Sequence, residues 1–205
     1  MIRLTPPTPS GEVSSGWGRP RDYRGGWHAG LDFFAPKGSP MLAAAPGVVA
    51  YVRNTAPAGN FAGRYAVIDH GNGTYTRYLH ADHIYAQTGD RVGRGDQIGL
   101  VGDSGTTSTA PHVHFDVKLT PEALAKYQAS FGKPTTGFAA EMKPWGFGVP
   151  AEALMDKARY RPGVLEQALA KGVSRYSPFA VAGIGIAGLV AIAGGGYLFY
   201  RYLTR

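Results

Sequence analysis

The chain has 205 residues, of which 44% are hydrophobic, and a formal net charge of +7 at neutral pH. This length is enough for one domain of common size with appendages and too short for two full domains. The absence of cysteine excludes disulfides, thiolate metal sites and thiol nucleophiles, so any metal must be bound by His, Asp or Glu. The excess of positive charge favours an anionic partner, and its scattered distribution predicts no specific nucleic-acid binding.

The N-terminal residues predict an extended lead-in to the folded domain. The segment MIRLTPPTPSGEVSS has no apolar run of the kind that a secretory signal needs, and its prolines favour an extended chain. We therefore expect residues 1–13 to be a lead-in, and we recognise no export signal in them.

Residues 14–118 predict a mainly β domain. Four short runs of β-branched and aromatic residues are separated by Gly, Pro and Asn: GVVAYVR, RYAVID, TYTRYL and QIGLVG. The pair Asn72 and Gly73 between the second and third runs suits a tight hairpin turn, because both residues tolerate positive φ. Short strands at this spacing indicate an antiparallel sandwich or barrel rather than alternating β and α units.

Two histidines occupy a stretch that otherwise resembles an ordinary strand, TAPHVHFDV. Because side chains alternate between the two faces of a strand, His112, His114 and Asp116 share one face and the apolar residues share the other. One face therefore contributes to a core, and the other displays nitrogen and oxygen ligands.

A second pair of candidate ligands lies in the stretch WHAGLDF, where three residues separate His28 from Asp32. The surrounding glycines favour a loop that leads into a strand. These two side chains and one imidazole of the HVH strand would provide three ligands and leave the fourth zinc position to water, which is typical of catalytic zinc.

The order of these motifs resembles the lysostaphin-like zinc metalloendopeptidases, which cleave peptide cross-links of bacterial peptidoglycan. The resemblance covers residues 14–118 and is carried by SSGWGRPRD, HAGLDFFAPKGSP, VIDHGNGTYTRYLH, GDRVGRGDQIGLVGDSG and PHVHFDV. It implies a metallopeptidase domain that holds one Zn²⁺ ion with a bound water. The implied metal ligands are His28, Asp32 and His114, and the implied catalytic proton carriers are His80 and His112. A degenerate domain that keeps the fold without the metal is the alternative.

The remaining histidines and one loop have less specific interpretations. We expect His70, in IDHGNG, to be a hydrogen-bonding residue of the hairpin rather than a catalyst. His83 is expected to be a surface residue without a role. The loop 54–63 is expected to influence which cross-link is cut, a choice that the sequence does not indicate.

After Lys118 the sequence predicts a partly helical stem over residues 119–176. TPEALAKYQASF predicts a helix that begins at Thr120 or Pro121, and residues 132–150 show no clear period. Two further short helices are predicted over 150–160 and 162–172, each with proline at its start.

The segment 179–200 carries no charge and is long enough to cross a bilayer, which takes roughly 20 apolar residues. We predict a transmembrane helix over 177–201 and a basic tail over 202–205, with a buried Gly- and Ala-rich core helix as the alternative. Basic residues on both sides leave the orientation open. Small residues every four positions would line one helix face and could support self-association; they are Gly183, Ala187, Ala191 and Gly195.

Together these features predict a membrane-anchored zinc endopeptidase whose substrates are the stem and cross-bridge peptides of peptidoglycan. A C-terminal anchor without a recognisable export signal suggests the internal membrane of a bacteriophage virion, where the enzyme would open the wall during genome entry. The alternatives are a bacterial envelope hydrolase exported by another route and a metal-free wall-binding or regulatory domain.

Overall fold

The computed structural model describes residues 2–21, 26–131, 141–142, 146–156 and 161–162, which all lie in the first of two compact units, 1–166. The predicted transmembrane helix over 177–201, with its small-residue face, and the tail 202–205 lie outside the described residues. The helix predicted over 162–172 also lies outside them, apart from Pro162, which belongs to a short strand. Within the described residues, no helix has the length and hydropathy that crossing a bilayer requires.

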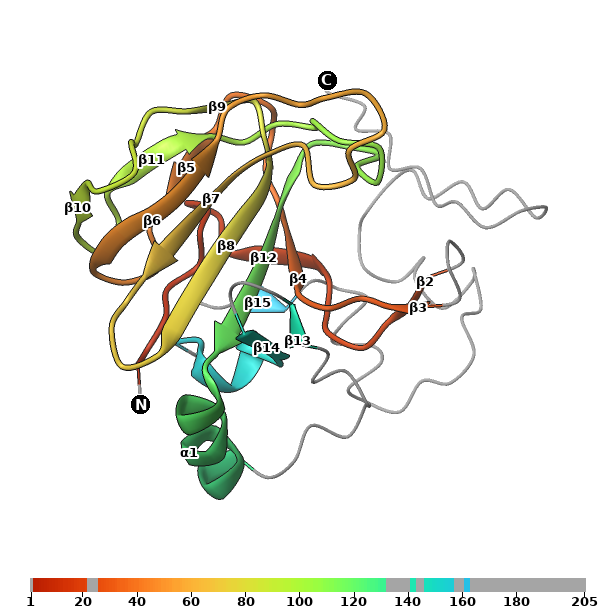
Figure 1. Cartoon of the computed structure of the whole chain (residues 1–205). Helices are drawn as coiled ribbons and strands as arrows, with labels where there is room; N and C mark the ends of the chain where they lie inside the picture. Colours follow the sequence, from red (N-terminus) through yellow and green to blue (C-terminus); the bar gives the residue numbers. More distant parts are fainter. Residues whose placement is uncertain (1, 22–25, 132–140, 143–145, 157–160, 163–205) are drawn as a thin grey trace. The chain divides into compact units, whose positions relative to one another are not determined.

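One large sheet organises the described residues (Figure 1). Its strand order is β10-β6-β7-β8-β12-β4-β1-β15, and β14 pairs with both β12 and β13. All pairs are antiparallel except β1 with β15. The strands of this sheet are β1 (Glu12–Ser15), β4 (Leu31–Phe34), β6 (Gly47–Arg53), β7 (Arg64–Asp69), β8 (Thr74–Ala81), β10 (Arg91–Val92), β12 (His112–Leu119), β13 (Glu141–Met142), β14 (Gly146–Val149) and β15 (Arg161–Pro162).

Two smaller sheets complete the β structure. One has the order β5-β11-β9, and the other is the β2–β3 pair. Their strands are β2 (Pro20–Arg21), β3 (Gly26–Trp27), β5 (Pro40–Leu42), β9 (His83–Ile84) and β11 (Gln97–Leu100). One helix, α1 (Pro121–Phe131), and a single 3₁₀ turn, η2 (Ala151–Leu154), are the helical elements of the described residues. The prediction of a mainly β, antiparallel domain is confirmed.

The core lies against one face of the large sheet. On β12 the apolar residues Val113, Phe115 and Val117 are fully buried, as the alternation predicted. The Phe115 ring packs edge-on against Phe33 of β4 and Tyr78 of β8, with ring centroids 6.0 and 5.3 Å apart. Strand β12 is therefore fixed between its two neighbours by its apolar side chains, while its histidines lie on the opposite face.

Residues on both sides of the predicted domain also pack into this core. Leu4 is fully buried, and its N–H donates to the carbonyl of Leu154 at 2.8 Å. Strand β14 pairs with the second half of β12, and its Val149 is fully buried. The expected lead-in over 1–13 and the described part of the expected stem thus belong to the same packed unit as residues 14–118.

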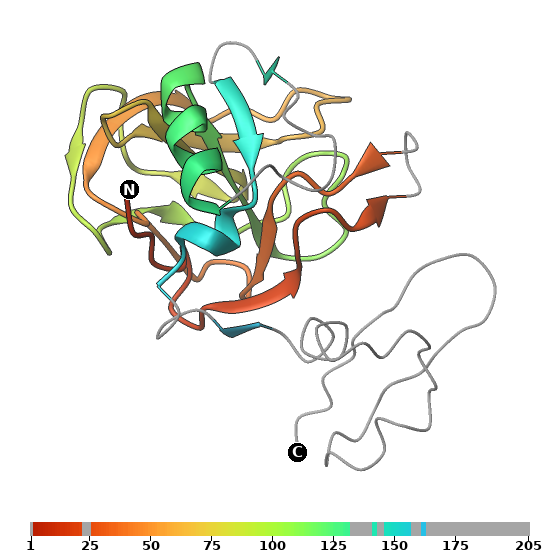
Figure 2. The same ribbon diagram turned by 90° about the horizontal axis from the view of Figure 1, so that it is seen from below.

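Helix α1 confirms the prediction of a helix that begins near Thr120, whose carbonyl accepts the N–H of Leu124 at 2.8 Å. Residues 157–160 of the helix predicted over 150–160 lie outside the described residues. In its described part, residues 150–156, the structure has only η2, which is one turn long and is followed by extended backbone at Met155 (φ −71°, ψ 143°). The reason is tertiary pairing, because the Asp156 N–H donates to the Leu4 carbonyl at 2.7 Å. Figure 2 shows α1 beside β14, with η2 close to the N-terminal segment.

The β7–β8 hairpin turns as predicted through Asn72 (φ 52°) and Gly73 (φ 72°). His70, at its base, hydrogen-bonds as expected: Nδ1 lies 2.8 Å from the Pro46 carbonyl, and Nε2 lies 2.7 Å from Oγ1 of Thr76. Thr76 in turn lies 3.0 Å from the buried hydroxyl of Tyr78. Because the Pro46 carbonyl can only accept, Nδ1 of His70 is the donor in that contact.

We predict that His70 makes the fold sensitive to acid. Burial lowers the pKa of His70 below its usual 6.5, more than the Pro46 carbonyl raises it. Because the folded state favours the neutral ring, the stabilisation is present above pH 6.5 and is lost as the pH falls below it. When the pH falls from about 7.5 to 5.5, the free energy of unfolding should therefore decrease less in His70→Gln than in the wild type. Urea unfolding at the two pH values measures this difference. His83→Gln, at an exposed position, is the matched control, and equal losses in all three proteins would contradict the prediction.

Candidate active site

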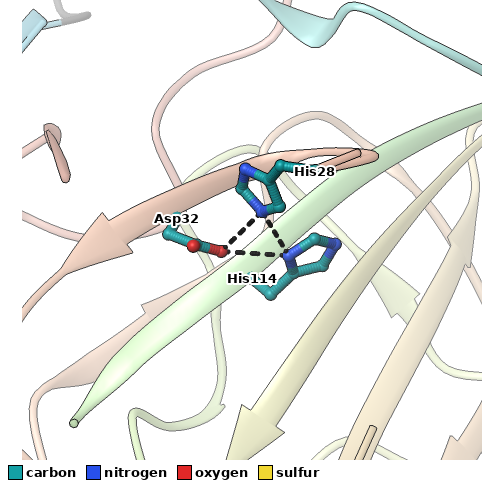
Figure 3. Close-up of side chains that lie close together, drawn as sticks. All are labelled: His28, Asp32 and His114. Carbon is teal, nitrogen blue, oxygen red and sulfur yellow. Dashed lines mark hydrogen bonds and ion pairs between the residues drawn. The ribbon is translucent and has the colours of Figure 1, made fainter. Parts of the chain in front are cut away.

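Three predicted ligands from two distant segments come together above the polar face of β12 (Figure 3). The Nε2 atom of His28 lies 2.9 Å from Nδ1 of His114 and 2.9 Å from Oδ1 of Asp32. The Nδ1 atom of His114 lies 3.0 Å from the same Asp32 oxygen. The three donor atoms therefore form a compact triangle that faces a common point.

Strand pairing explains why these side chains meet. Asp32 on β4 and His114 on β12 are directly opposite each other in the antiparallel register, so their side chains leave the same face of the sheet. Gly30 permits the close approach, because a Cβ at that position would lie 2.6 Å from the Phe115 carbonyl and 2.8 Å from Nε2 of His114. The glycine of the HAGLD motif is thus required by the geometry of the site.

Hydrogen bonds fix which nitrogen of each ring faces the triangle. The Nδ1 atom of His28 lies 2.8 Å from the carbonyl of Gly16, so it donates there and presents the Nε2 lone pair to the site. For His114 the arrangement is reversed: Nε2 faces Oδ2 of Asp116 at 3.4 Å, and Nδ1 points into the triangle. Carboxylates at both ring nitrogens raise the pKa of His114 despite its burial.

The donor set fits a zinc ion. Two imidazole nitrogens and one carboxylate oxygen are common zinc ligands, and tetrahedral coordination at about 2.0–2.1 Å would hold them about 3.3 Å apart, slightly more than the spacing found here. Burial raises the pKa of the Asp32 carboxyl, and the imidazoles of His28, His114 and His112 outweigh this and hold the pKa well below its usual range. Asp32 is therefore an anionic ligand, as a metal requires.

The two predicted proton carriers lie beside this triangle. The ring centroids of His80 and His112 are 4.8 Å apart, and Nε2 of His112 is 3.7 Å from Oδ1 of Asp32. Each ring is anchored through Nδ1, in His80 by the Ser104 carbonyl at 2.8 Å and in His112 by the Ala110 carbonyl at 2.7 Å. In both rings Nε2 is therefore the nitrogen that can exchange a proton, and in His112 it faces Asp32.

His80 is held in an unusual conformation. Its φ of 68° lies in the left-handed region, which non-glycine residues seldom adopt. Its N–H donates to the Ala62 carbonyl at 3.1 Å, and its carbonyl accepts the Ser104 N–H at 3.3 Å, so the loop 54–63 and the segment at Ser104 hold the strained backbone. Burial, with the nearby His112 and His114, lowers the pKa of His80 to about 3.

Sequence reasoning missed two sets of supporting residues. Asp116 was grouped with the displayed ligands, whereas it is fully buried and pairs with Arg77. The segment that holds His28 was also not foreseen as support: the Gly18 N–H donates to the His28 carbonyl at 2.8 Å, and the Trp17 N–H donates to Oε1 of Glu152 at 2.9 Å. The SSGWGRPRD motif was the available signal for this segment. His83 lies on the surface, and its ring contacts Tyr85.

Comparison with known proteins agrees with this geometry. Residues 26–125, which contain all five histidine and aspartate residues of the site, match peptidase family M23. The peptidoglycan DD-endopeptidase ShyA of Vibrio cholerae is 44% identical over 90 residues, which are 44% of this chain and 20% of ShyA. The catalytic domain of lysostaphin from Staphylococcus simulans is 31% identical, with 52% of this chain and 79% of that domain covered and a TM-score of 0.46.

Residues 26–125 form a domain of peptidase family M23. The resemblance noted in the sequence is thereby confirmed, and the zinc-peptidase chemistry of the M23 family agrees with the donor set of the site. Csd3 of Helicobacter pylori, 22% identical, shares the M23 fold with a TM-score of 0.51, over 85% of this chain and 41% of its own. The chain spans only part of the length of its curated relatives: it covers 20% of ShyA, and 24% and 20% of two others.

We predict that Glu152, outside the segment matched to the M23 family, supports zinc binding through His28. In Glu152→Ala the Trp17 N–H loses its acceptor, which loosens the neighbouring Gly16 carbonyl that orients the His28 ring. Zinc affinity of the folded protein should fall several-fold, less than the tenfold or more that is typical for a direct partner of a ligand. Competition with a chromophoric chelator measures the affinity. Glu122→Ala, at an exposed position on α1, is the control, and an unchanged affinity in Glu152→Ala would refute the prediction.

Proposed function

We propose that this protein is a zinc-dependent endopeptidase that cleaves peptide cross-links of peptidoglycan. The observation that carries the proposal is the convergence of His28, Asp32 and His114 on one point, with two further imidazoles beside it. The relationship to ShyA, a peptidoglycan DD-endopeptidase, supports the choice of substrate and favours a link to a D-alanyl residue. Glycine bridges are the alternative substrate.

The chemistry divides between the metal and the two proton carriers. A zinc ion held by His28, Asp32 and His114 would polarise the scissile carbonyl and activate a water molecule. His80 and His112 are anchored through Nδ1, so their Nε2 atoms can accept a proton and return it to the leaving amine. The low pKa of His80 keeps its ring neutral at physiological pH.

A further part of the proposal is where the enzyme is located. The uncharged stretch 179–200 supports a lipid-embedded C-terminal anchor, and Gly183, Ala187, Ala191 and Gly195 would let two such anchors associate. We infer a virion-associated lytic enzyme in the internal membrane of a bacteriophage. A bacterial envelope hydrolase and a metal-free wall-binding module are the competing functions.

We expect the full-length protein in detergent to release peptides from purified peptidoglycan, and this activity to stop on chelation and return with zinc. His114→Ala should lose both activity and bound zinc, because it removes a ligand. His80→Ala should lose at least about 10²-fold in rate and keep its zinc, because it removes only a proton carrier. His83→Ala is the matched control and should retain both. Mass spectrometry of the released fragments identifies the bond. Lysis that persists after chelation would contradict the zinc mechanism, and wall binding without any turnover would indicate a binding module.

Fractionation tests the proposed location. If the protein serves wall penetration, antibody against residues 26–125 should detect it in purified virus particles and, after their disruption, in the lipid fraction. Detection solely in host envelopes would overturn the virion assignment and favour the bacterial alternative, without affecting the proposed chemistry.

A further inference from the structure

A buried carboxylate contacts the far side of one proposed zinc ligand. Asp116 follows His114 by two residues on β12, and its side chain leaves the same face of the strand. It is fully buried and lies outside the triangle of donor atoms. Its Oδ2 atom is 3.4 Å from Nε2 of His114, the nitrogen that points away from that triangle.

Two cations hold this carboxylate in place. Arg77, the cross-strand partner of Asp116 on β8, donates from Nε to both carboxylate oxygens at 2.8 and 3.1 Å, and from Nη2 to Oδ2. Nζ of Lys118 lies 3.6 Å from Oδ1 and is itself fully buried. Within the described residues, Lys118 Nζ has no hydrogen-bond partner, so its interaction with Asp116 is electrostatic.

If these buried charges served only to stabilise the fold, their free-energy cost would be hard to explain. Removing three charges from water is unfavourable, and apolar residues of similar volume often stabilise a core equally well. The two cations alone would also repel a divalent ion bound at the other nitrogen of His114. The carboxylate of Asp116 lies between them and the imidazole, so a role toward that imidazole explains why the buried charges are present.

We propose that Asp116, clamped by Arg77 and Lys118, is a positioning residue that orients the His114 imidazole for zinc binding. It accepts the Nε2 proton, which fixes the tautomer with the lone pair on Nδ1 and limits rotation of the ring. An anionic acceptor at Nε2 also makes Nδ1 a stronger donor to the metal. This inference rests on the proposed zinc site and adds to it a residue that contacts no substrate.

The test measures zinc affinity in Asp116→Asn, which nearly preserves the side-chain volume and removes the charge. In the full-length protein in detergent, competition with a chromophoric chelator should show affinity reduced by about 10- to 100-fold. Glu12→Gln, which removes an exposed carboxylate from the same sheet, is the matched control and should bind zinc like the wild type. Thermal unfolding of the metal-free proteins gives the structural contribution separately.

The tautomer supplies a readout that a structural role alone would not change. Long-range ¹H–¹⁵N spectra of the zinc-loaded protein should show one His114 form, with the proton on Nε2 and slow exchange with solvent in the wild type and faster exchange in Asp116→Asn. Equal zinc affinity and equal exchange in both proteins would overturn the inference. If Asp116→Asn does not fold, a wild-type His114 Nε2 proton that exchanges as fast as a solvent-exposed one also overturns it. A wild-type protein that binds no zinc would instead overturn the proposed function.

Discussion

The pairing of β4 with β12 is the constraint on which the site depends. Their register places Asp32 opposite His114, so one antiparallel ladder brings together ligands that are 82 positions apart in the chain. Since side chains alternate along a strand, a slip of one residue would turn the imidazole of His114 into the core and Phe115 into the site. The packing of Phe115 between Phe33 and Tyr78 opposes such a slip. The packing of the apolar face of β12 thus determines which side chains its polar face presents to the site.

The support for the site extends beyond the segment that matches the M23 family. His28 is held by residues 15–19, and Trp17 of this segment in turn donates its N–H to the carboxylate of Glu152. Strand β1 pairs with β4 in the large sheet, and an isolated bridge joins Leu4 to Met155 near the other end of the described residues. The functional unit therefore includes residues on both sides of 26–125. The motifs within 26–125 supply the ligands, and the flanking residues hold these ligands in place.

The sequence was most informative where local rules determine the outcome. Alternation along β12 predicted which residues share a face, and proline and threonine at 120–121 predicted the start of α1. It was least informative where distant segments meet. The burial of Asp116 depends on Arg77 from another strand. In the described part of the helix predicted over 150–160, Met155 pairs with Leu4 instead of continuing a helix. Helix propensity acts over a few residues and carries no information on such a partner.

The left-handed backbone at His80 restricts how this position can change. A β-branched residue there would lose the imidazole and also clash with its own main chain, whereas Gly would adopt this conformation without strain and Asn at a lower cost than most residues. Descendants of this chain that abandon catalysis while keeping the fold should therefore drift toward those two residues. The backbone geometry, rather than selection for activity, would then determine which residues occupy this position.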